Sequence, residues 1–524
     1  MSINKYPFAN HNQAVARSAS IISLATLTSR ILGFVRDVII ARLFGVYIYA
    51  QAFVIAFRIP NLFRDLVGEG ASNAAIVPVL SEYNLKRSKE EFWELANILL
   101  NLLAVILSLI TLLGIILSPL IVRMIAPGFI ASPEKLQATI NLNRIIFPYI
   151  LLIGLAAYAM AVLNSLKNFA ISAFAPCFLN IAIIVCAVLL GEGTTGLAAG
   201  VLLGGLSQLA VQVPVLYKKG FRPKFSLVFK HPGVIQIKNL ILPRILSSSI
   251  YQLNNFFDSI FGSLAAIVGE GGVAVLYFAY RLIQFPIGIF SNAIAQAILP
   301  TFSTQVFEAN QENLKNTLCW GLRIVNFVML PTTALFMLLA YPLVSALFGG
   351  GKFDSHSSLL TANALFFYSI GLTAYGGSKI LQSCFFALKD TVTPTKIAGL
   401  ALLMNVILNA LLMFPLKIGG LALATSISGI VSFFCLFFIL RCRLGGFYER
   451  KVLKSFLRIL AVTLCMSAVC YLVNQALNFV WALFCAAIAY IFFSFVFRVS
   501  ELTELLQWLG QRNAKPSLWN NCRN

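Results

Sequence analysis

LANILLNLLAVILSLITLLGIILS, residues 95–118, contains no charged side chain over its whole length. A helix needs about 20 apolar residues to cross the hydrocarbon core of a membrane, so this run is long enough for one span. A membrane-spanning β-barrel would show short segments in which apolar and polar residues alternate. The run therefore indicates an α-helical membrane protein.

The rest of the chain has the same character. Of its 524 residues, 59% are hydrophobic and only 11% are charged, whereas soluble domains carry about 25% charged residues. Apolar runs bounded by glycine, proline or charged residues predict about 14 spans. The fold class we expect is an all-α polytopic membrane protein, with much of its surface in contact with membrane lipids.

The net charge of +21 is concentrated in loops. With the N-terminus inside, basic residues cluster in three segments that also lie inside: 86–89, 218–230 and 441–454. This distribution follows the positive-inside rule, so we expect a multi-pass membrane protein with both termini in the cytoplasm. The rule accounts for the charge, so no nucleic-acid partner is expected.

Three motifs recur in the same order. IGLAAY (153–158) returns as IGLTAY (370–375), GLAAGVLLGG (196–205) as GLALATSISG (420–429), and AAIVPVLS (74–81) as QAILPTFS (296–303). Each half then holds six spans, an even number, so the halves share one orientation as a parallel pseudo-repeat. The expected divisions are an N-terminal lobe (1–217), a basic loop (218–237), a C-terminal lobe (238–441), two further helices (442–498) and a tail (499–524).

Arginines inside the predicted spans are the strongest functional signal, because a charge at the bilayer centre is costly. Arg30, Arg36, Arg64 and Arg281 lie in apolar stretches near helix-loosening residues. The planar guanidinium binds phosphate oxygens bidentately, so a pyrophosphate is a suitable guest. Arg36 could also pair with its neighbour Asp37. Five other arginines are interpreted as interfacial anchors: Arg42, Arg58, Arg144, Arg244 and Arg323.

A second polar group lies in the predicted C-terminal lobe. Asp258 is the one acid well inside the span predicted at 238–267. Asn405 and Asn409 share a face of the span predicted at 394–414, and Thr425 lies in the next one, predicted at 419–441. Oxygen ligands suit a hard cation such as sodium. Two alternatives stay open: the groups hydrogen-bond neighbouring helices, or Asp258 carries a proton.

An enzyme is not expected. The three histidines, His11, His231 and His356, fall in predicted polar loops, and no metalloprotease, hydrolase or phosphate-binding motif occurs. No cofactor is implied beyond a coupling ion or the membrane potential.

Several long stretches resemble the MurJ/MviN family of lipid II flippases, and the likeness runs from about residue 15 to 500. They are SRILGFVRD (29–37), RIPNLFRDLVGEGA (58–71), APGF (126–129), FPYILLIGL (147–155), YRLIQFPIGIFSNAIAQAILP (280–300) and KDTVTPTKIA (389–398). The resemblance implies two six-helix lobes around a central cavity, and a groove at the last two helices for a polyprenyl tail. It also implies transport of lipid II from the cytoplasmic to the periplasmic leaflet by alternating access.

Carried over by motif, the family's cavity arginines match Arg30, Arg36, Arg64 and Arg281, and its acids match Asp37 and Glu69. A sodium site found in some members matches Asp258, Asn405, Asn409 and Thr425. The chain departs from the family pattern at Gln51, Tyr280 and Asn409, where acids are common. These departures make the cavity more positive and remove one carboxylate from the cation site.

Other functions are weighed against this one. An exporter of another polyprenyl-diphosphate-linked oligosaccharide handles the same chemistry, whereas a drug exporter for cations would need an acidic or aromatic cavity. A scaffold for cell-wall enzymes would tolerate loss of the arginines, and cell-wall synthesis enzymes remain candidate partners. A polytopic enzyme acting on such lipids would need catalytic carboxylates or histidines near a membrane face.

Overall fold

The computed structural model describes residues 7–64, 75–191, 193–226, 228 and 230–504, with side chains from residue 20 onward except 242–251. Regular structure within these ranges is helical apart from an isolated bridge between Gly350 and Phe353. The described chain forms two compact units. Unit 1 comprises the residues up to Ala266 with 270–274 and 348–354, and unit 2 comprises 267–269, 275–347 and the residues from Ser355 on.

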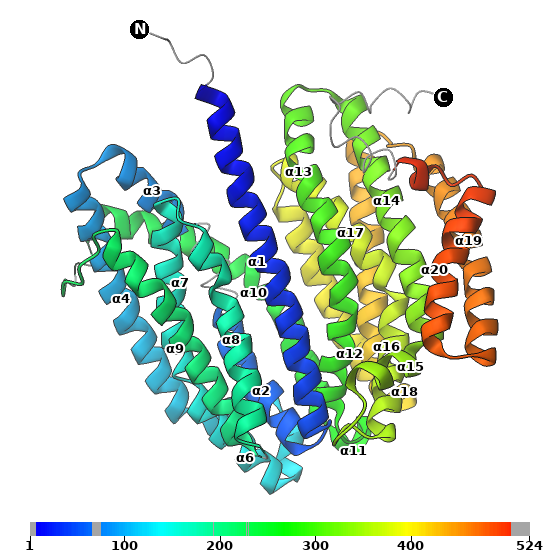
Figure 1. Ribbon diagram of the computed structural model, residues 1–524, viewed down its shortest axis with the longest axis horizontal. Coiled ribbons are helices and arrows are strands. Elements are labelled where there is room, and N and C mark those ends of the chain that lie inside the picture. The colour runs from blue at the N-terminus through cyan, green and yellow to red at the C-terminus, as the bar shows by residue number, and fades with distance from the viewer. Residues whose placement is uncertain (1–6, 65–74, 192, 227, 229, 505–524) are drawn as a thin grey trace. The chain divides into compact units, whose positions relative to one another are not determined.

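Figure 1 labels the helices in chain order. The first ten are α1 (Pro7–Phe44), α2 (Ile48–Phe63), α3 (Val77–Lys86), α4 (Lys89–Ile116), α5 (Ser118–Ile125), α6 (Pro133–Ile146), α7 (Tyr149–Ser165), α8 (Ala170–Leu189), α9 (Thr194–Lys218) and α10 (Pro232–Ser263), with a 3₁₀ turn η2 (Pro127–Ala131). They are followed by α11 (Ala265–Val268), α12 (Gly272–Pro286), a π-helical turn η3 (Ile287–Ser291), α13 (Asn292–Phe307), α14 (Gln311–Leu338), α15 (Ala340–Phe348), α16 (Ser355–Ile370), α17 (Leu372–Ala387), α18 (Val392–Leu444), α19 (Glu449–Ala476) and α20 (Phe479–Val496).

Nine helical segments of the described chain are long and apolar enough to cross a membrane, or ten if α16 and α17, which are bent by 45°, count as one span. A Cβ atom at Gly371, between these two helices, would lie 2.9 Å from Cα of Ser426, so α18 packs closely against this position. The predicted all-α membrane fold is confirmed, while the total of fourteen spans stays a prediction.

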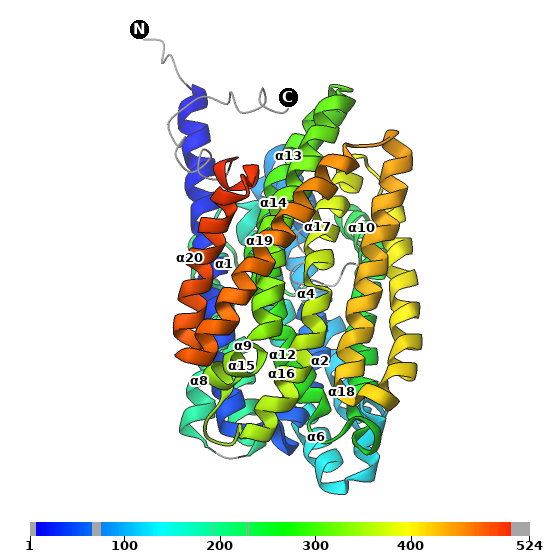
Figure 2. The same ribbon diagram turned by 90° about the vertical axis from the view of Figure 1, so that its right-hand side faces the viewer.

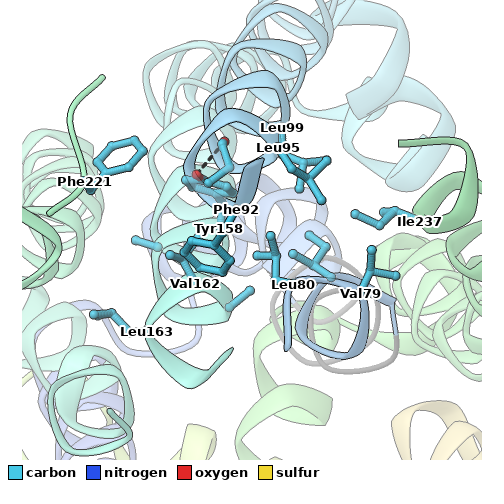
Figure 3. Close-up of a cluster of buried hydrophobic side chains, with 14 of the residues drawn as sticks. Val79, Leu80, Phe92, Leu95, Leu99, Tyr158, Val162, Leu163, Phe221 and Ile237 are labelled. Atoms are coloured by element: carbon cyan, nitrogen blue, oxygen red, sulfur yellow. Dashed lines mark hydrogen bonds between the residues drawn. The ribbon is translucent and has the colours of Figure 1, made fainter. Parts of the chain in front are cut away.

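The core of unit 1 is apolar and joins helices that are distant in sequence. Figure 3 shows Leu80 of α3, Phe92 of α4 and Val162 of α7 in one cluster, all at most 2% exposed. The hydroxyl of Tyr158 donates to the carbonyl oxygen of Ala96 at 2.7 Å, which satisfies the one polar group of this side chain in an apolar setting.

The repeated motifs occupy equivalent helices in the two units. In unit 1 they lie on α3, α7 and α9, and α7 packs against α3, α4 and α9 (Figure 1). In unit 2 they lie on α13, α17 and α18, and α17 packs against α13, α14 and α18. The same neighbours recur around the motif-bearing helices, as expected of an internal duplication.

The helix α18 consists of two arms. Lys417 has φ 52° and ψ −128°, a non-helical conformation that interrupts the hydrogen-bond ladder. A Cβ atom at Gly420 would lie 2.1 Å from the carbonyl oxygen of Leu412, so the arms approach closely at this break. At the outer ends, Asp390 accepts from the backbone N–H of Thr393 (2.9 Å) and pairs with Arg443 at 2.6 Å. The break separates the two spans predicted at 394–414 and 419–441.

Helices α19 and α20 form a hairpin that packs on α14 within unit 2 (Figure 2). Buried Met466, Cys470, Ala482 and Ala486 join the two helices. The hydroxyl of Tyr490 donates to the carbonyl oxygen of Phe327 at 2.6 Å. The hairpin is thus attached to unit 2 by apolar packing and a buried hydrogen bond.

Candidate functional site

Two arginines on α1 lie in different environments. Arg36 is 2% exposed, and its guanidinium donates twice to Oδ1 of Asp37, at 2.7 and 3.0 Å, and to Oδ1 of Asn180 on α8 at 3.1 Å. The predicted local pairing of Arg36 with Asp37 is confirmed. A buried charge is tolerated only when it is paired and hydrogen-bonded, and these contacts meet that requirement. They also join α1 to α8.

Arg30, six residues earlier on α1, is exposed. Within the described residues its guanidinium makes no hydrogen bond and no ion pair. Compared with Arg36, Arg30 is therefore the α1 arginine whose fork is open to an anionic ligand.

The end of α2 carries two more arginines of unit 1. Arg58 donates to the backbone carbonyl of Asn255 on α10, so it joins two helices. Its position at the membrane interface stays a prediction. Arg64 is half-buried at the C-cap of α2, directly after Pro60 and Phe63. The predicted acid Glu69 lies outside the described residues.

Arg281 is the charged residue of α12 in unit 2. Its guanidinium lies over the ring of Tyr277, 5.3 Å from the centroid, and donates to the Tyr277 hydroxyl at 3.3 Å. This aromatic contact helps to orient the planar fork. Further along the chain, Pro286 ends the regular helix and the π-helical turn η3 follows.

The predicted cation ligands divide between the units. Asn405, Asn409 and Thr425 lie on the two arms of α18 and are buried, whereas Asp258 belongs to α10 of unit 1. Asn409 donates to Oδ1 of Asn405 at 2.9 Å, and Asn405 donates to Oγ1 of Thr425 at 3.0 Å. The Thr425 hydroxyl in turn donates to the carbonyl of Leu421 at 3.1 Å.

In this chain of hydrogen bonds, Oδ1 of Asn405 and Oγ1 of Thr425 each accept from an uncharged amide N–H group. The arrangement fits the alternative in which polar groups hydrogen-bond neighbouring helices. A cation at these three groups would have to replace some of these bonds, so the sodium site stays a prediction. We therefore derive no transport step through a bound ion.

Lys379 was not singled out in the sequence. It lies on α17, is half-buried, and has no hydrogen bond or ion pair within the described residues. A lone lysine in an apolar run is the signal that could have identified it, because intramembrane charges mark transport pathways.

A second missed cluster lies at the end of the hairpin. Arg323 of α14 contacts Glu501 at 2.5 Å and Glu504 at 3.1 Å, and Ser455 of α19 donates to Glu501 at 2.5 Å. Glu501 is 2% exposed. Burial raises the pKa of Glu501, but the charge of Arg323 and the hydrogen bonds outweigh it, so the pKa lies below its ordinary value. Arg323, which lies near the middle of α14, is therefore a structural link between α14 and the segment that follows α20.

The sequence is similar to those of known lipid II flippases. A family model described as lipid II flippase MurJ matches residues 40–492. The probable lipid II flippase MurJ of Buchnera aphidicola from Acyrthosiphon pisum is 36% identical over 464 residues, covering 88% of this chain and 90% of that protein. The lipid II flippase MurJ of Burkholderia cenocepacia is 32% identical over 475 residues, covering 89% and 91%.

Solved structures give the same result. A structure of lipid II flippase MurJ in an inward closed conformation aligns with a TM-score of 0.79 at 28% identity, over 91% of this chain and 98% of that one. An inward-facing multidrug resistance transporter of the MATE family aligns with a TM-score of 0.66 at 17% identity, over 80% and 94%, which shows a shared fold only. By the extent of the family match and the identity to its relatives, the chain belongs to the MurJ family of lipid II flippases.

Proposed function

We propose that this chain moves lipid II, the lipid-linked precursor of peptidoglycan, from the cytoplasmic to the outer leaflet of the bacterial inner membrane. The observation that carries the proposal is that a chain of this family keeps cations inside its apolar helices. Arg30 on α1 and Lys379 on α17 form no ion pair within the described residues, and Arg281 on α12 holds its guanidinium beside Tyr277. The family consists of flippases and not of enzymes.

The chemistry of the head group matches these side chains. Lipid II carries a diphosphate, and arginine binds phosphate oxygens through two parallel N–H donors. In the proposed mechanism Arg30 and Arg281 each bind diphosphate oxygens in the course of transport, while the polyprenyl tail stays in lipid. Arg36 is already engaged with Asp37 and Asn180, which favours a supporting role for it over direct contact.

Transport follows from alternating access, in which the protein exposes its binding groups to one leaflet and then the other. The substrate shifts this equilibrium only by its differential affinity for the two states. Net direction then needs another source: the membrane potential, an ion gradient, or consumption of lipid II outside. A potential of 100 mV acts with about 2.3 kcal/mol on each charge that crosses it, enough to bias a conformational change that moves one arginine.

The orientation is part of the proposal. The basic segments after α3, after α9 and around the end of α18 favour a cytoplasmic location for both termini. Sodium coupling at Asn405, Asn409 and Thr425 stays a prediction from the family resemblance. A higher melting temperature in sodium than in potassium buffer, lost in an Asn405→Ala variant, would support it.

The decisive test is exposure of lipid II at the outer face of spheroplasts. The probe is an enzyme that cleaves the head group and cannot cross the membrane. Depletion of this protein should protect lipid II from cleavage, and the wild-type gene should restore cleavage. Arg30→Ala and Arg281→Ala should fail to restore it although both variants reach the membrane in normal amounts.

Arg144→Ala is the matched control, since Arg144 is exposed in the last turn of α6. It should restore cleavage fully. Cleavage that persists after depletion would exclude lipid II as the substrate and favour another polyprenyl-diphosphate-linked saccharide. Full restoration of lipid II cleavage by both Arg30→Ala and Arg281→Ala would favour a scaffold role for cell-wall enzymes.

A further inference from the structure

Asn180 on α8 is a buried amide that holds α1 at two points. Its side chain is 7% exposed and lies in unit 1. Oδ1 of Asn180 accepts from the guanidinium of Arg36 at 3.1 Å. Nδ2 donates to the carbonyl of Ser29 at 3.2 Å and to that of Pro176, in its own helix, at 3.4 Å. One side chain thus joins α8 to two positions of α1 that are seven residues apart.

The amide of Asn180 has one orientation in this setting. A guanidinium only donates hydrogen bonds and a backbone carbonyl only accepts them, so Oδ1 must face Arg36 and Nδ2 must face Ser29. A flipped amide would place N–H groups against N–H groups and two oxygens against each other. Leucine lacks both groups, and aspartate would turn a carboxylate toward the Ser29 carbonyl. The position therefore requires a side chain that donates and accepts in this geometry.

The two points of attachment lie on one face of α1. At about 100° per residue, Ser29, Gly33 and Arg36 fall within about 60° of one another around the helix. A Cβ atom added to Gly33 would lie 3.7 Å from both amide atoms of Asn180, so Asn180 packs directly on the backbone of α1. Figure 1 shows α1 and α8 side by side, and the two helices pack on each other. This face is therefore the one that α1 turns toward α8.

Arg30 projects from a different side of α1. It follows Ser29 directly, so it lies about 100° around the helix from the face that Asn180 holds. The exposed side chains of Leu27 and Ile31 lie further around the helix in the same direction. By holding the Ser29–Arg36 face against α8, Asn180 therefore turns Arg30 away from α8.

The position of the Arg30 guanidinium is sensitive to a rotation of α1. Side chains reach about 6 Å from a helix axis, so a rotation of about 20° moves this group by about 2 Å. A binding residue has to be held to within about 0.5 Å and 10–20° of its productive geometry. Within the described residues Arg30 makes no hydrogen bond or ion pair that would correct such a rotation. Its direction therefore depends on how α1 itself is held.

We propose that Asn180 is a positioning residue for transport. By fixing the rotation of α1 about its axis, Asn180 directs Arg30 toward the diphosphate of the substrate. Both polar atoms of Asn180 are engaged within the protein, so it acts through Arg36 and the α1 backbone and does not bind the substrate. This inference rests on the function proposed above for Arg30.

The test is the affinity of the full-length purified protein for lipid II, measured by native mass spectrometry in detergent. Arg30→Ala removes a charge-assisted contact and should weaken binding by about tenfold or more. Asn180→Leu should weaken binding as well, but by no more than Arg30→Ala does. Asn180→Ala, which removes the amide without adding an apolar side chain, replaces Asn180→Leu if that variant does not reach the membrane.

The double variant Arg30→Ala/Asn180→Leu separates positioning from a merely structural role. Its affinity should equal that of Arg30→Ala to within about twofold, because a side chain that is absent cannot be misdirected. Losses that multiply would show that Asn180 acts independently of Arg30 and would overturn the proposal. So would an Asn180→Leu variant that binds lipid II like wild type.

Gln212→Leu is the matched control. Gln212 on α9 is also a buried amide of unit 1, and its Nε2 donates to the carbonyl of Ala156 on α7 at 3.2 Å. Its hydrogen bonds thus join α9 to α7 and not α8 to α1. Gln212→Leu should lower the melting temperature as Asn180→Leu does, yet keep the wild-type affinity for lipid II. An equal loss of affinity in this control would reduce the effect to general destabilisation and refute the positioning role.

A second readout needs no lipid II. Phenylglyoxal modifies arginine side chains, and mass spectrometry of the peptides gives the rate at each arginine. In wild type the exposed Arg30 should react much faster than Arg36, which is 2% exposed and hydrogen-bonded to Asp37 and Asn180. In Asn180→Leu the ratio of the two rates should fall by about tenfold, because Arg36 loses a hydrogen bond and α1 is no longer held in one rotation.

The two readouts distinguish the proposals. Rates at Arg30 and Arg36 that are the same in Asn180→Leu and in wild type would refute the positioning role alone. Wild-type protein that binds no lipid II would instead refute the proposed function on which the role depends.

Discussion

Removal of one charge from the Arg36–Asp37 pair should destabilise the protein strongly. Both side chains are buried, at 2% and 0% exposure, and three donor contacts hold the guanidinium. Breaking a buried pair leaves an uncompensated charge and costs about 3–5 kcal/mol. We expect Asp37→Leu and Arg36→Met each to lose stability in this range.

The double variant Arg36→Met/Asp37→Leu should be much more stable than the sum of its parts. Replacing both members by apolar groups removes the stranded charge, and such replacements are often neutral. In this variant Oδ1 of Asn180 loses one hydrogen-bond donor. The Asn180 side chain still contacts α1, because its amide nitrogen donates to the Ser29 carbonyl at 3.2 Å. We expect a coupling energy of at least about 2 kcal/mol between the two positions.

Unfolding by sodium dodecyl sulfate in mixed micelles measures these free energies for purified wild type and the three variants. Independent positions add to within about 0.5 kcal/mol, so a coupling energy below that value would refute the argument. Lipid II exposure in the same strains separates the two roles of Arg36. If Arg36 also binds the diphosphate, the double variant regains stability without regaining transport.

Four further outcomes are expected. Hydrogen bonds from the Thr393 backbone and hydroxyl lower the pKa of Asp390 to about 2. The stability that the Asp390 carboxylate contributes is therefore complete above pH 4 and is lost as the pH falls toward 2. The melting temperatures of wild type and Asp390→Asn should converge over that range, and a constant difference would contradict this. Arg323→Met strands a buried carboxylate and should cost about 3 kcal/mol in mixed-micelle unfolding, whereas an unchanged midpoint would show that the cluster contributes nothing. Asn405→Leu should cost about 1–3 kcal/mol by leaving buried partners without a hydrogen bond, equally in sodium and potassium if the group only pairs helices. Lys379→Met should raise the melting temperature and reduce lipid II exposure, because the lysine destabilises the fold and serves transport. A fall in both the melting temperature and lipid II exposure would instead indicate a structural role.

Local features of this chain could be predicted from the sequence. Long apolar runs gave the helical membrane fold, and the polar, proline-containing stretch around Lys417 separated two spans correctly. The pairing of Arg36 with Asp37 followed from their adjacency in an apolar helix.

Long-range partners could not be predicted in this way. Asn180 lies 144 residues from Arg36, and Glu501 lies 178 residues from Arg323. Nothing in a local pattern distinguishes a carboxylate in a polar tail from one that is buried against a distant helix. Lys379 was missed for a different reason. It is the single lysine of its helix, and a lysine does not bind phosphate bidentately as arginine does.

The ion pairs at the end of the hairpin also set where this polypeptide can be shortened or extended. A truncation or a fluorescent-protein fusion placed directly after Val496, the last residue of α20, would discard Glu501 and leave Arg323 facing no carboxylate from that segment. A junction placed after Glu504 keeps both acids. In engineering terms, residues 497–504 have to be kept together with α20, because they carry the acids that pair with Arg323.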